Sequence, residues 1–470
     1  MQTHCNQECF EFYPLARREV VGRFNGGAIT SDAGGLLLRE VEKRTKIVER
    51  FAGCFRDHRD AERIEHTVKE LVAQRVYALA LGYEDLNDHD QLRQDPLLAV
   101  LAEKGDPLGE SRARERDRGK ALAGKSTLNR LELTKAVVKD DERYKKIVID
   151  AEAVDRLLVE VFLEAHATPP TEIVLDMDAT DDPVHGNQEG RFFHGYYGHY
   201  CYLPLYIFCG DFLLCARLRP SNIDASAGCL EEIKRMVAQI RQAWPEVKIT
   251  LRGDAGFCRD ELMTWGEAAG VDYVLGLAKN ERLKAEIAAE LEPAAAEFEA
   301  TGKPARVFKE LVYQTRESWS RARRVIAKAE HLEKGSNPRF VVTSLSAEKW
   351  EARRLYEELY CARGEMENRI KEQLMLFADR TSTAFLRSNQ IRLYFSSVAY
   401  VLMEALRRMG LKQTELAQAQ SSTIRLKLLK IGALIRITVR KVWVSMAGGY
   451  PYRELFAQVY AQLRAAPLRR

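Results

Sequence analysis

The stretch TEIVLDMDAT, residues 171–180, marks the point at which the chain changes from mostly helical to β-rich sequence. This short run of apolar and β-branched residues predicts a strand, and two aspartates stand at its end. Asp176 and Asp178 are two residues apart and therefore point to the same face of the strand. The first strand of the predicted sheet thus carries two carboxylates at its C-terminal end.

Short β-rich runs continue downstream of residue 180, at first consecutively and then with helices between them. The second to fifth strands are expected within residues 191–208, 211–220, 247–257 and 271–280, with helices over 226–244 and 260–270. Three consecutive strands followed by alternating helices and strands indicate a mixed α/β sheet. This is the order of an RNase H-like fold, in which the first and fourth strands are neighbours.

A second β-rich segment, residues 283–347, interrupts this pattern before a helix resumes it. An Ala- and Glu-rich helix is followed there by three runs that predict antiparallel strands. The expected fold class is therefore α/β, with a mixed five-stranded sheet and helices interrupted by a β-rich insertion. The expected boundaries are 1–165 for a helical N-terminal region, 166–282 and 348–400 for the two parts of the core, 283–347 for the insertion and 401–470 for a basic helical C-terminal region.

The composition is that of an ordinary globular protein, with 46% hydrophobic and 30% charged residues among 470, which excludes bulk disorder. No apolar run reaches the roughly 18 residues that a membrane-spanning helix needs. The N-terminus lacks the basic and then apolar stretch of a signal peptide. The nine cysteines are scattered without a C-x-x-C pair, which favours reduced thiols. We therefore predict a soluble cytoplasmic protein.

Positive charge is concentrated at the C-terminal end of the chain. Residues 380–470 contain 16 Lys and Arg against 3 acidic residues, although the net charge of the whole chain is only +4. A folded segment this basic favours a polyanion partner, because Lys and Arg release counterions from a phosphate backbone. The alternative is a solvated basic surface without a partner.

Two further carboxylates join Asp178 as candidate functional residues. Asp254 follows the fourth predicted strand in RGDAGF, where two glycines allow a sharp turn, and active sites of α/β sheets commonly form outside such strand ends. Glu367 lies on the helix after the insertion. At about 100° per residue, one face of this helix carries four polar side chains. They are Tyr360, Arg363, Glu367 and Lys371.

Three clustered carboxylates cannot all be ionised at low cost unless a cation is present. Oxygen ligands suit Mg²⁺ or Mn²⁺, and two such ions would activate a water or 3′-hydroxyl and stabilise the leaving oxygen of a phosphodiester. Each carboxylate also has a structural interpretation: Asp178 as a turn cap, Asp254 in an Asx-turn and Glu367 in an ion pair with Arg363. Their joint positions in the predicted fold favour the metal site.

These motifs resemble those of a known enzyme family. D-A-T at Asp178, R-G-D-A-G-F at Asp254 and Tyr-x2-Arg-x3-Glu at residues 360–367 resemble the DDE transposases of bacterial insertion sequences. More narrowly, the chain is similar to the insertion-sequence family numbered thirteen-eighty, a relative of the cut-and-paste group with the Tyr-Arg-Glu-Lys signature. The similarity extends from SDAGG at residues 31–35 to FADRTS at residues 377–382.

The resemblance implies an RNase H-like core with a β-rich insertion before the glutamate. It implies Asp178, Asp254 and Glu367 as the triad that binds two Mg²⁺ or Mn²⁺ ions. Tyr360 and Arg363 would hold phosphates at the transposon end. No ATP should be needed.

Two positions on or near the signature require their own interpretation. The signature expects a lysine seven residues after the glutamate, but this position is Leu374, and Lys371 on the same helical face is the candidate replacement. Relatives pass through a DNA hairpin intermediate in which a tryptophan of the insertion accepts a flipped base. Trp319, in RESWSRARR, is the candidate here, because an aromatic ring beside arginines can stack a base. Packing of Trp319 inside the insertion sheet is an equal alternative.

Two other patterns carry little weight. GKALAGKS at residues 119–126 matches the Walker A pattern, but a phosphate loop must follow a buried strand, and ESRARERDR precedes this one. We interpret the match as accidental and expect a basic loop that opens a short helix. His185, His194 and His199 are expected to be strand and turn residues, because a zinc site requires tighter paired ligands.

These features together predict a DNA transposase that binds terminal inverted repeats of double-stranded DNA as a homodimer, cleaves the element ends and joins them to target DNA. The N-terminal region is the expected DNA-binding part, with DNA or subunit contacts from the C-terminal region. The alternatives are an RNase H-like nuclease without strand transfer and a non-catalytic DNA-binding relative. The expected location is the bacterial cytoplasm, at the nucleoid and without membrane association.

Overall fold

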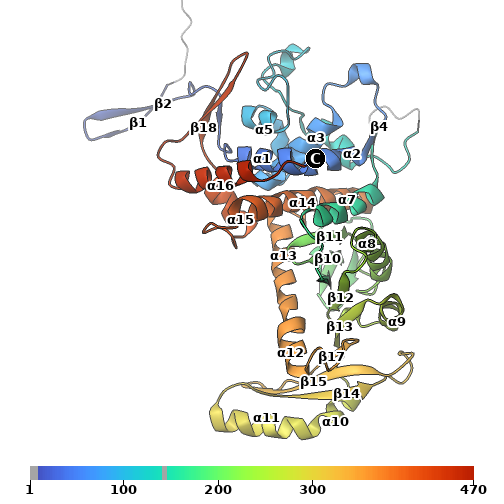
Figure 1. Ribbon diagram of the computed structural model, residues 1–470. Coiled ribbons are helices and arrows are strands. Elements are labelled where there is room, and N and C mark those ends of the chain that lie inside the picture. Colours follow the sequence, from blue (N-terminus) through green and yellow to red (C-terminus); the bar gives the residue numbers. More distant parts are fainter. Residues whose placement is uncertain (1–8, 140–145, 470) are drawn as a thin grey trace, which may run out of the picture. The chain divides into compact units, whose positions relative to one another are not determined.

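The structure, a computed structural model, describes residues 9–139 and 146–469 (Figure 1). The chain folds into two compact units, of which Met1–Ile149 and Val398–Arg470 form the first and Asp150–Ser397 form the second. The first unit therefore combines both ends of the chain, which differs from the separate N-terminal and C-terminal regions that the sequence predicts. Residues 1–8, where no signal peptide is expected, lie outside the described part of the chain.

A large mixed sheet forms the centre of the second unit. Nine of the described strands belong to it, in the order β11–β10–β6–β12–β13–β17–β15–β14 with β16 paired to β15. Their bounds are Glu172–Ala179 (β6), Leu205–Cys209 (β10), Phe212–Arg217 (β11), Lys248–Gly253 (β12), Asp272–Leu277 (β13), Ala305–Tyr313 (β14), Arg323–Leu332 (β15), Gly335–Ser336 (β16) and Arg339–Thr343 (β17). The predicted mixed α/β architecture is confirmed.

Strand β6 lies between an antiparallel neighbour, β10, and a parallel neighbour, β12. The first and fourth predicted strands are therefore adjacent, as expected. Met177 of β6 pairs with Gly253, the last residue of β12. This register puts the residues that follow each of them, Asp178 and Asp254, at the same edge of the sheet.

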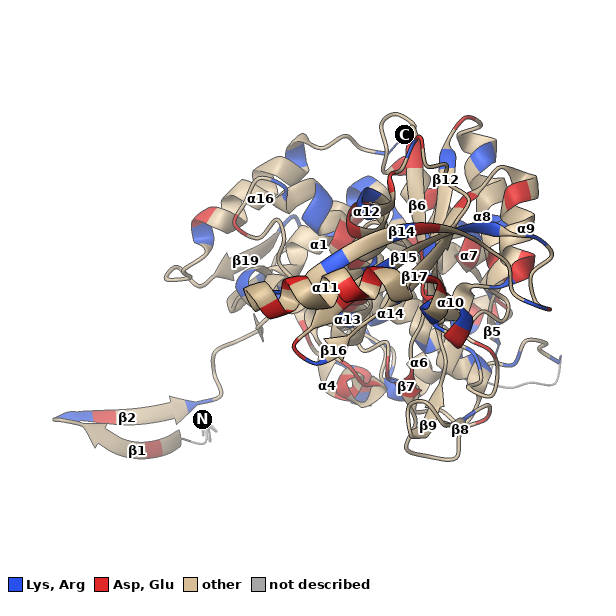
Figure 2. Cartoon of the chain, turned by 90° about the horizontal axis from the view of Figure 1, so that it is seen from below, with Lys and Arg blue, Asp and Glu red and all other residues tan. Residues whose placement is uncertain are grey.

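The predicted β-rich insertion continues this sheet, so the sheet is larger than the five strands expected. β17 pairs with β13, and β15 pairs with both β17 and β14, all in the predicted antiparallel sense. Val341 and Val342 of β17 are both fully buried, so this strand is covered on both faces and lies inside the sheet. Helices Glu281–Glu286 (α10) and Ala288–Thr301 (α11) precede these strands, and the glutamates of α11 are visible as red bands in Figure 2.

Helices pack on the sheet of the second unit. They are Ala151–Glu164 (α7), Cys229–Ala243 (α8), Asp260–Ala269 (α9), Ala352–Arg354 (α12) and Gly364–Met375 (α13), and Leu386–Leu406 (α14) continues into the first unit. Phe162 of α7 shares a core cluster with Met177 of β6. The sequence assigns α7 to the N-terminal region, whereas Asp155 on this helix accepts hydrogen bonds from Arg217 and Tyr394 of the second unit.

The first unit is mostly helical, as predicted for the N-terminal region. Its helices are Gly35–Thr45 (α1), Ile47–Gly53 (α2), Val68–Leu81 (α3), His89–Leu92 (α4), Pro96–Leu101 (α5), Lys125–Glu132 (α6), Ser421–Ile424 (α15) and Arg453–Ala465 (α16). Thr67 and Glu70 form a capping box at the start of α3, and Gly82 ends it with a φ of 97°. In neither unit is a described helix long and apolar enough to cross a membrane.

Strands also occur in both terminal regions, contrary to the prediction that these regions are helical. They are Cys9–Leu15 (β1), Arg18–Arg23 (β2), Ile29–Thr30 (β3), Phe55–Asp57 (β4), Ile147–Ile149 (β5), Ala433–Ile437 (β18) and Val442–Met446 (β19). In β18, Ala433 and Ile435 are buried, while Leu434 and Arg436 are exposed. This period of two identifies a strand, and the helical prediction is wrong at this hairpin because its many basic residues obscure the short apolar alternation.

The two ends of the chain interlock inside the first unit. β18 pairs with β3, which joins residue 434 to residue 29. Gly34, from the SDAGG segment, lies against the backbone of Leu428, where an added Cβ atom would be 1.8 Å from the carbonyl oxygen. Only glycine permits this approach, because any side chain would displace the C-terminal segment. The SDAGG segment is thus a docking point for residues near 430.

Candidate active site

A cavity of about 650 Å³ opens at the edge of the sheet where β6 and β12 end. Three segments that are far apart in the chain line it, and each contributes residues that the sequence singles out. These are Asp178, Asp254, Arg363, Glu367 and Lys371. The structure thus brings the three predicted carboxylates to one cavity, whereas Tyr360 and Trp319 are not among its lining residues.

The two aspartates of β6 have different surroundings although they share a face. Leu175 and Met177 point into the core, so Asp176 and Asp178 point to the opposite face, as the spacing predicts. Asp176 is 4% exposed, and both of its oxygens accept hydrogen bonds from Arg252, at 2.5 and 2.8 Å. This bidentate pair matches the charge of Asp176. Asp178 is the carboxylate that is left to face the cavity.

Asp178 is mostly buried and carries no strong ion pair. Its Oδ1 atom accepts a hydrogen bond from the backbone N–H of Ala179 at 3.0 Å, and the guanidinium of Arg363 is 3.8 Å away. Burial is the main cause that raises the pKa of Asp178 to about 6. The charges of Asp254 and Glu367 act in the same direction, and Arg363 opposes them. The cavity thus concentrates negative charge that nearby groups do not fully neutralise.

Asp254 is held in place by the turn that follows β12. Its Oδ1 atom accepts a hydrogen bond from the N–H of Gly256 at 2.8 Å and caps a single 3₁₀ turn, Ala255–Phe257 (η4). Gly276 of β13 lies directly beside this turn. A Cβ atom there would be 2.7 Å from the Tyr360 hydroxyl and 2.9 Å from the N–H nitrogen of Ala255.

Gly276 is therefore a positioning residue that the sequence analysis missed. Its lack of a side chain lets the Asp254 turn and Tyr360 approach β13 closely. A glycine in the middle of VLGL, a predicted buried strand, is the signal that could have found it.

The helix that carries the Tyr-Arg-Glu signature is not a continuous α-helix. A π-helical segment, Leu355–Tyr360 (η5), and a 3₁₀ segment, Cys361–Arg363 (η6), separate α12 from α13. A regular 100° spacing therefore holds only from residue 364 onward, which keeps Glu367 and Lys371 on one face and lets Tyr360 turn toward Gly276. Burial raises the pKa of the Tyr360 hydroxyl. Irregular segments of this kind are frequent at functional sites.

The donor chemistry of the cavity fits a hard divalent cation, because its acidic ligands are all carboxylates. The three carboxylates are not arranged around a single position that a metal ion could occupy. Within the described residues, no group of three or more His, Cys, Asp or Glu side chains is close enough to hold a metal ion. The guanidinium of Arg363 lies between two of the carboxylates, 3.8 Å from Asp178 and 3.4 Å from Glu367. Arg363 thus occupies the position between Asp178 and Glu367 that a metal ion bound by both carboxylates would take.

A small antiparallel sheet borders the cavity and supplies aromatic residues that the sequence analysis did not select. Asp182–Pro183 (β7), Phe192–His194 (β8) and His199–Tyr202 (β9) form it, in the order β7–β9–β8. The turn between β8 and β9 places Tyr196 and Tyr197 on the cavity wall. Tyr197 donates to the carbonyl oxygen of Ala179 at 3.4 Å, next to Asp178, whereas Tyr196 is 87% exposed. Histidines 194 and 199 lie in its strands, as expected.

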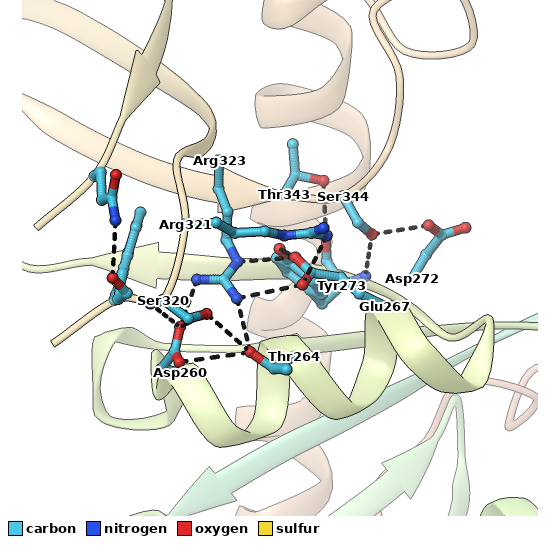
Figure 3. A network of polar contacts seen from close by, with 12 residues as sticks. Asp260, Thr264, Glu267, Asp272, Tyr273, Ser320, Arg321, Arg323, Thr343 and Ser344 are labelled. Atoms are coloured by element: carbon cyan, nitrogen blue, oxygen red, sulfur yellow. Dashed lines mark hydrogen bonds and ion pairs between the residues drawn. The ribbon is translucent and has the colours of Figure 1, made fainter.

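Trp319 packs in the core of the second unit and is only 6% exposed. Its ring lies 5.9 Å from the ring of Tyr313 and 5.6 Å from the guanidinium of Arg323. Arg323 is held in turn by Asp260 and Glu267, at 2.6 and 2.8 Å. Figure 3 shows this network, which fastens the start of β15 to helix α9. The structure therefore places Trp319 in the packing position that the sequence left as an alternative.

The Walker-like segment has the local structure that the sequence predicts. Turns without a preceding strand lead from residue 119 into α6, which begins at Lys125. The side chain of Lys125 donates to Asn87 at 3.1 Å and lies 3.5 Å from Asp90. A phosphate loop needs a buried strand before it, so this segment has a different architecture.

Comparison with known proteins gives one family match. The sequence matches the family model described as transposase DDE domain, group 1, over residues 12–468. Among solved structures, the chain is similar to a piggyBac transposase synaptic complex with hairpin DNA, studied by cryo-electron microscopy. That similarity has 11% sequence identity and a TM-score of 0.41, and it covers 85% of this chain and 80% of that chain. No curated protein matches the sequence.

Proposed function

The chain belongs to the transposase DDE domain group 1 family, and we propose that it is a DNA transposase of the cut-and-join type. In this proposal it binds the terminal inverted repeats of an element, cleaves the element ends and joins them to target DNA. The observation that carries the proposal is the cavity to which separate segments bring Asp178, Asp254 and Glu367. The strand order β11–β10–β6–β12–β13 supports an RNase H-like arrangement of the catalytic core.

Asp178, Asp254 and Glu367 are the residues that would hold divalent metal ions. When bound, Mg²⁺ or Mn²⁺ would supply activation of a water or 3′-hydroxyl and stabilisation of the leaving oxygen. Because the pKa of Asp178 is about 6, its carboxyl is mostly ionised above neutral pH and available as a ligand. The Asp254 carboxylate is held at the cavity by the hydrogen bond that it accepts from the N–H of Gly256.

Arg363 and Lys371 are the cations of the cavity, and their role is to bind DNA phosphates. In the structure Arg363 contacts two carboxylates only weakly, at 3.4 and 3.8 Å. We expect its guanidinium to leave them when a metal ion takes over their charge, and then to bind the phosphate beside the scissile bond. The Tyr360 hydroxyl lies next to Gly276, beside the Asp254 turn, and its role is to support the position of that turn.

The finer assignments also belong to this proposal. The motifs support membership of the insertion-sequence family numbered thirteen-eighty, action as a homodimer on DNA and a location at the nucleoid of a bacterial cell. These assignments rest on the resemblance of the sequence motifs to that family.

The test is a cleavage assay on linear DNA that carries the sequences flanking the coding region, with purified protein and Mg²⁺. Wild type is compared with Glu367→Gln and with Glu365→Gln, which removes the same charge from the same helix but from a residue that does not line the cavity. We expect cleavage at the element boundary and joined products with wild type and Glu365→Gln, and neither with Glu367→Gln.

Other outcomes of this assay would point elsewhere. Cleavage without joined products or end preference would identify a nuclease. End-specific binding without any cleavage by wild type would identify a non-catalytic relative. Boundary cleavage that survives Glu367→Gln would refute the assignment of the carboxylates.

A further inference from the structure

The hairpin of β18 and β19 extends as a two-stranded ribbon beyond β3, which pairs only with Ala433 and Leu434 at its base in the first unit. The two strands pair from Ala433 with Met446 to Ile437 with Val442. Their connection is closed by Thr438, whose hydroxyl donates to the carbonyl oxygen of Lys441 at 2.9 Å and accepts from its N–H at 3.1 Å. The ribbon therefore has a defined turn and a defined face.

One face of the ribbon is exposed and combines an aromatic ring with cations. Arg436 and Trp443 are paired across the strands, and Trp443 is 46% exposed. The guanidinium of Arg436 lies 5.9 Å from the centre of the Trp443 ring, and the ammonium of Lys441 lies 5.2 Å from it. At the turn, Val439 is fully exposed and Arg440 follows it.

The cations of the ribbon have no acidic partners. No Asp or Glu occurs between Glu415 and Glu454. Throughout the described residues, no ion pair involves Arg436, Arg440 or Lys441, and all three are exposed. Three positive charges on one narrow ribbon therefore lack a counter-charge within this chain.

Other cations of the same segment, by contrast, do have partners within the chain. Lys430 pairs with Asp32 at 2.6 Å, and Arg425 donates to the carbonyl oxygen of Ala80 at 2.9 Å. These two hold the C-terminal segment on the helices of the first unit. Arg436, Arg440 and Lys441 form no such ion pair in the described residues, so their charge is available to a ligand.

A phosphate backbone complements this surface in charge and in shape. The major groove of duplex DNA, about 12 Å wide, admits a two-stranded β-ribbon. Cations along the ribbon release counterions from phosphates, and an aromatic ring can make apolar contact with base edges in the major groove. An anionic lipid surface would attract the same charges, so lipid binding is a separate outcome of the test.

We propose that the β18–β19 ribbon enters a groove of duplex DNA, with Arg436, Arg440 and Lys441 on phosphates and Trp443 against the groove wall. This inference rests on the proposed function, because it takes duplex DNA as the substrate. It assigns DNA binding to the C-terminal part of the first unit, which the sequence left open as DNA or subunit contact.

The test measures binding of the full chain to a fluorescent duplex carrying the element end, by anisotropy in EDTA, as a function of salt. The variant Arg436→Gln/Arg440→Gln/Lys441→Gln is compared with Lys279→Gln/Lys303→Gln/Lys334→Gln, which removes three exposed cations of the second unit. We expect the ribbon variant to bind about a hundredfold more weakly at 0.1 M salt, with a salt slope lower by about 3. The control variant should keep the wild-type affinity and slope.

Two further variants separate the contribution of charge to DNA binding from the contribution of the aromatic ring. Arg440→Gln, at the exposed turn, should lower the salt slope by about 1. Trp443→Ala should weaken binding about tenfold with little change of slope, because apolar contact with the groove wall is not electrostatic. Thermal melting of each variant checks that the first unit is intact.

The outcomes distinguish this inference from the proposed function. Unchanged affinity and slope of the ribbon variants, with wild type binding and cleaving the DNA, would overturn the ribbon assignment and leave the transposase assignment standing. Failure of wild type itself to bind the element end would instead count against the proposed function. Binding of wild type to anionic vesicles that the triple variant loses, with DNA binding unchanged, would reassign the ribbon to a lipid surface.

Discussion

The Arg323 network and the carboxylate cavity contain the same kinds of side chain in opposite balance. In the network one arginine, only 2% exposed, is bound by two carboxylates at hydrogen-bond distance. In the cavity two of the three carboxylates share Arg363, whose guanidinium stays 3.4 Å or more from Asp178 and Glu367. The paired charges of the network stabilise the fold, whereas the cavity has more carboxylates than cations and can accept a positively charged ligand.

The β18–β19 ribbon is the positive counterpart of the cavity. Its cations lack carboxylate partners, just as the cavity carboxylates lack sufficient cations. The proposed function needs one surface that attracts phosphates and another that attracts metal ions, and both proposals rest on charges that the fold leaves unpaired. Matched and unmatched charges should therefore respond differently to substitution.

The largest difference is expected between Asp254→Asn and Asp260→Asn, which remove the same charge from the cavity and from the network. Asp254→Asn should lower the cleavage rate about 10⁴-fold, the scale of losing one member of a catalytic unit, with an unchanged or higher melting temperature because repulsion in the cavity falls. Asp260→Asn should lower the melting temperature and keep the cleavage rate of the folded protein. Cleavage kinetics and calorimetry measure both, and the opposite pattern would contradict the division into matched and unmatched charge.

Removal of the central cation of the network is the next largest effect. Arg323→Met should lower the free energy of unfolding by about 3–5 kcal/mol, because it leaves two carboxylates without their shared partner. Arg321→Met is the matched control: Arg321 also pairs with Glu267, at 2.7 Å, but is 61% exposed, so its loss should cost at most about 1 kcal/mol. Urea unfolding followed by tryptophan fluorescence reports both, since Trp319 adjoins the network. Equal decreases in the free energy of unfolding for the two variants would show that burial of Arg323 does not determine the contribution of the network to stability.

Asp178 makes the stability of the second unit depend on pH. Its pKa is about 6 in the folded chain against an ordinary 3.8, so between these values the folded state keeps a proton that the unfolded state releases. Stability relative to Asp178→Asn is therefore fully present below pH 4 and falls by roughly 3 kcal/mol as the pH rises through 6. Denaturant titrations from pH 4 to 8 in EDTA measure this difference. Mg²⁺ should reduce the loss above pH 6, and parallel curves for the two proteins would refute it.

The smallest effect concerns the backbone that supports the cavity. Gly276→Ala should lower the free energy of unfolding by about 1–3 kcal/mol, because the new methyl group overlaps the Tyr360 hydroxyl and the Asp254 turn. Combining it with Tyr360→Phe, which removes that hydroxyl, should restore part of the loss. Thermal melts of the single and double variants measure the coupling, and additive losses would show that the two residues act independently.

Much of the second unit can be predicted from the sequence because its signals are local. The run of residues 171–180 is a strand, and its adjacency to the fourth strand follows from the order of elements, which is enough to bring Asp178 and Asp254 to one edge. The helix face of Glu367 and Lys371 follows from helical spacing. The π-helical segment before it does not, because it depends on how Tyr360 packs beside Gly276.

The remaining features depend on contacts between distant residues, which no single stretch of sequence reveals. The arginines around Trp319 suggest a DNA contact until Asp260 and Glu267, more than 50 residues earlier, are seen to bind Arg323. In the same way, the pairing of β18 with β3, about 400 positions away, is not visible in either stretch of sequence. The basic composition around β18 indicates a polyanion partner but not the ribbon that presents the charge.

The interlocking of Gly34 with Leu428 and of β3 with β18 has a consequence for synthesis of the protein. Domains fold as units while the chain emerges from the ribosome, the N-terminal parts first. Here the first unit cannot close until residues beyond 437 have been translated, whereas Asp150–Ser397 can fold while translation continues. A message truncated before that point would therefore yield a chain with the carboxylates of the cavity but without a closed first unit. Closure of the first unit also requires α16, whose Val459 and Leu463 are fully buried, so almost the whole chain must be translated first.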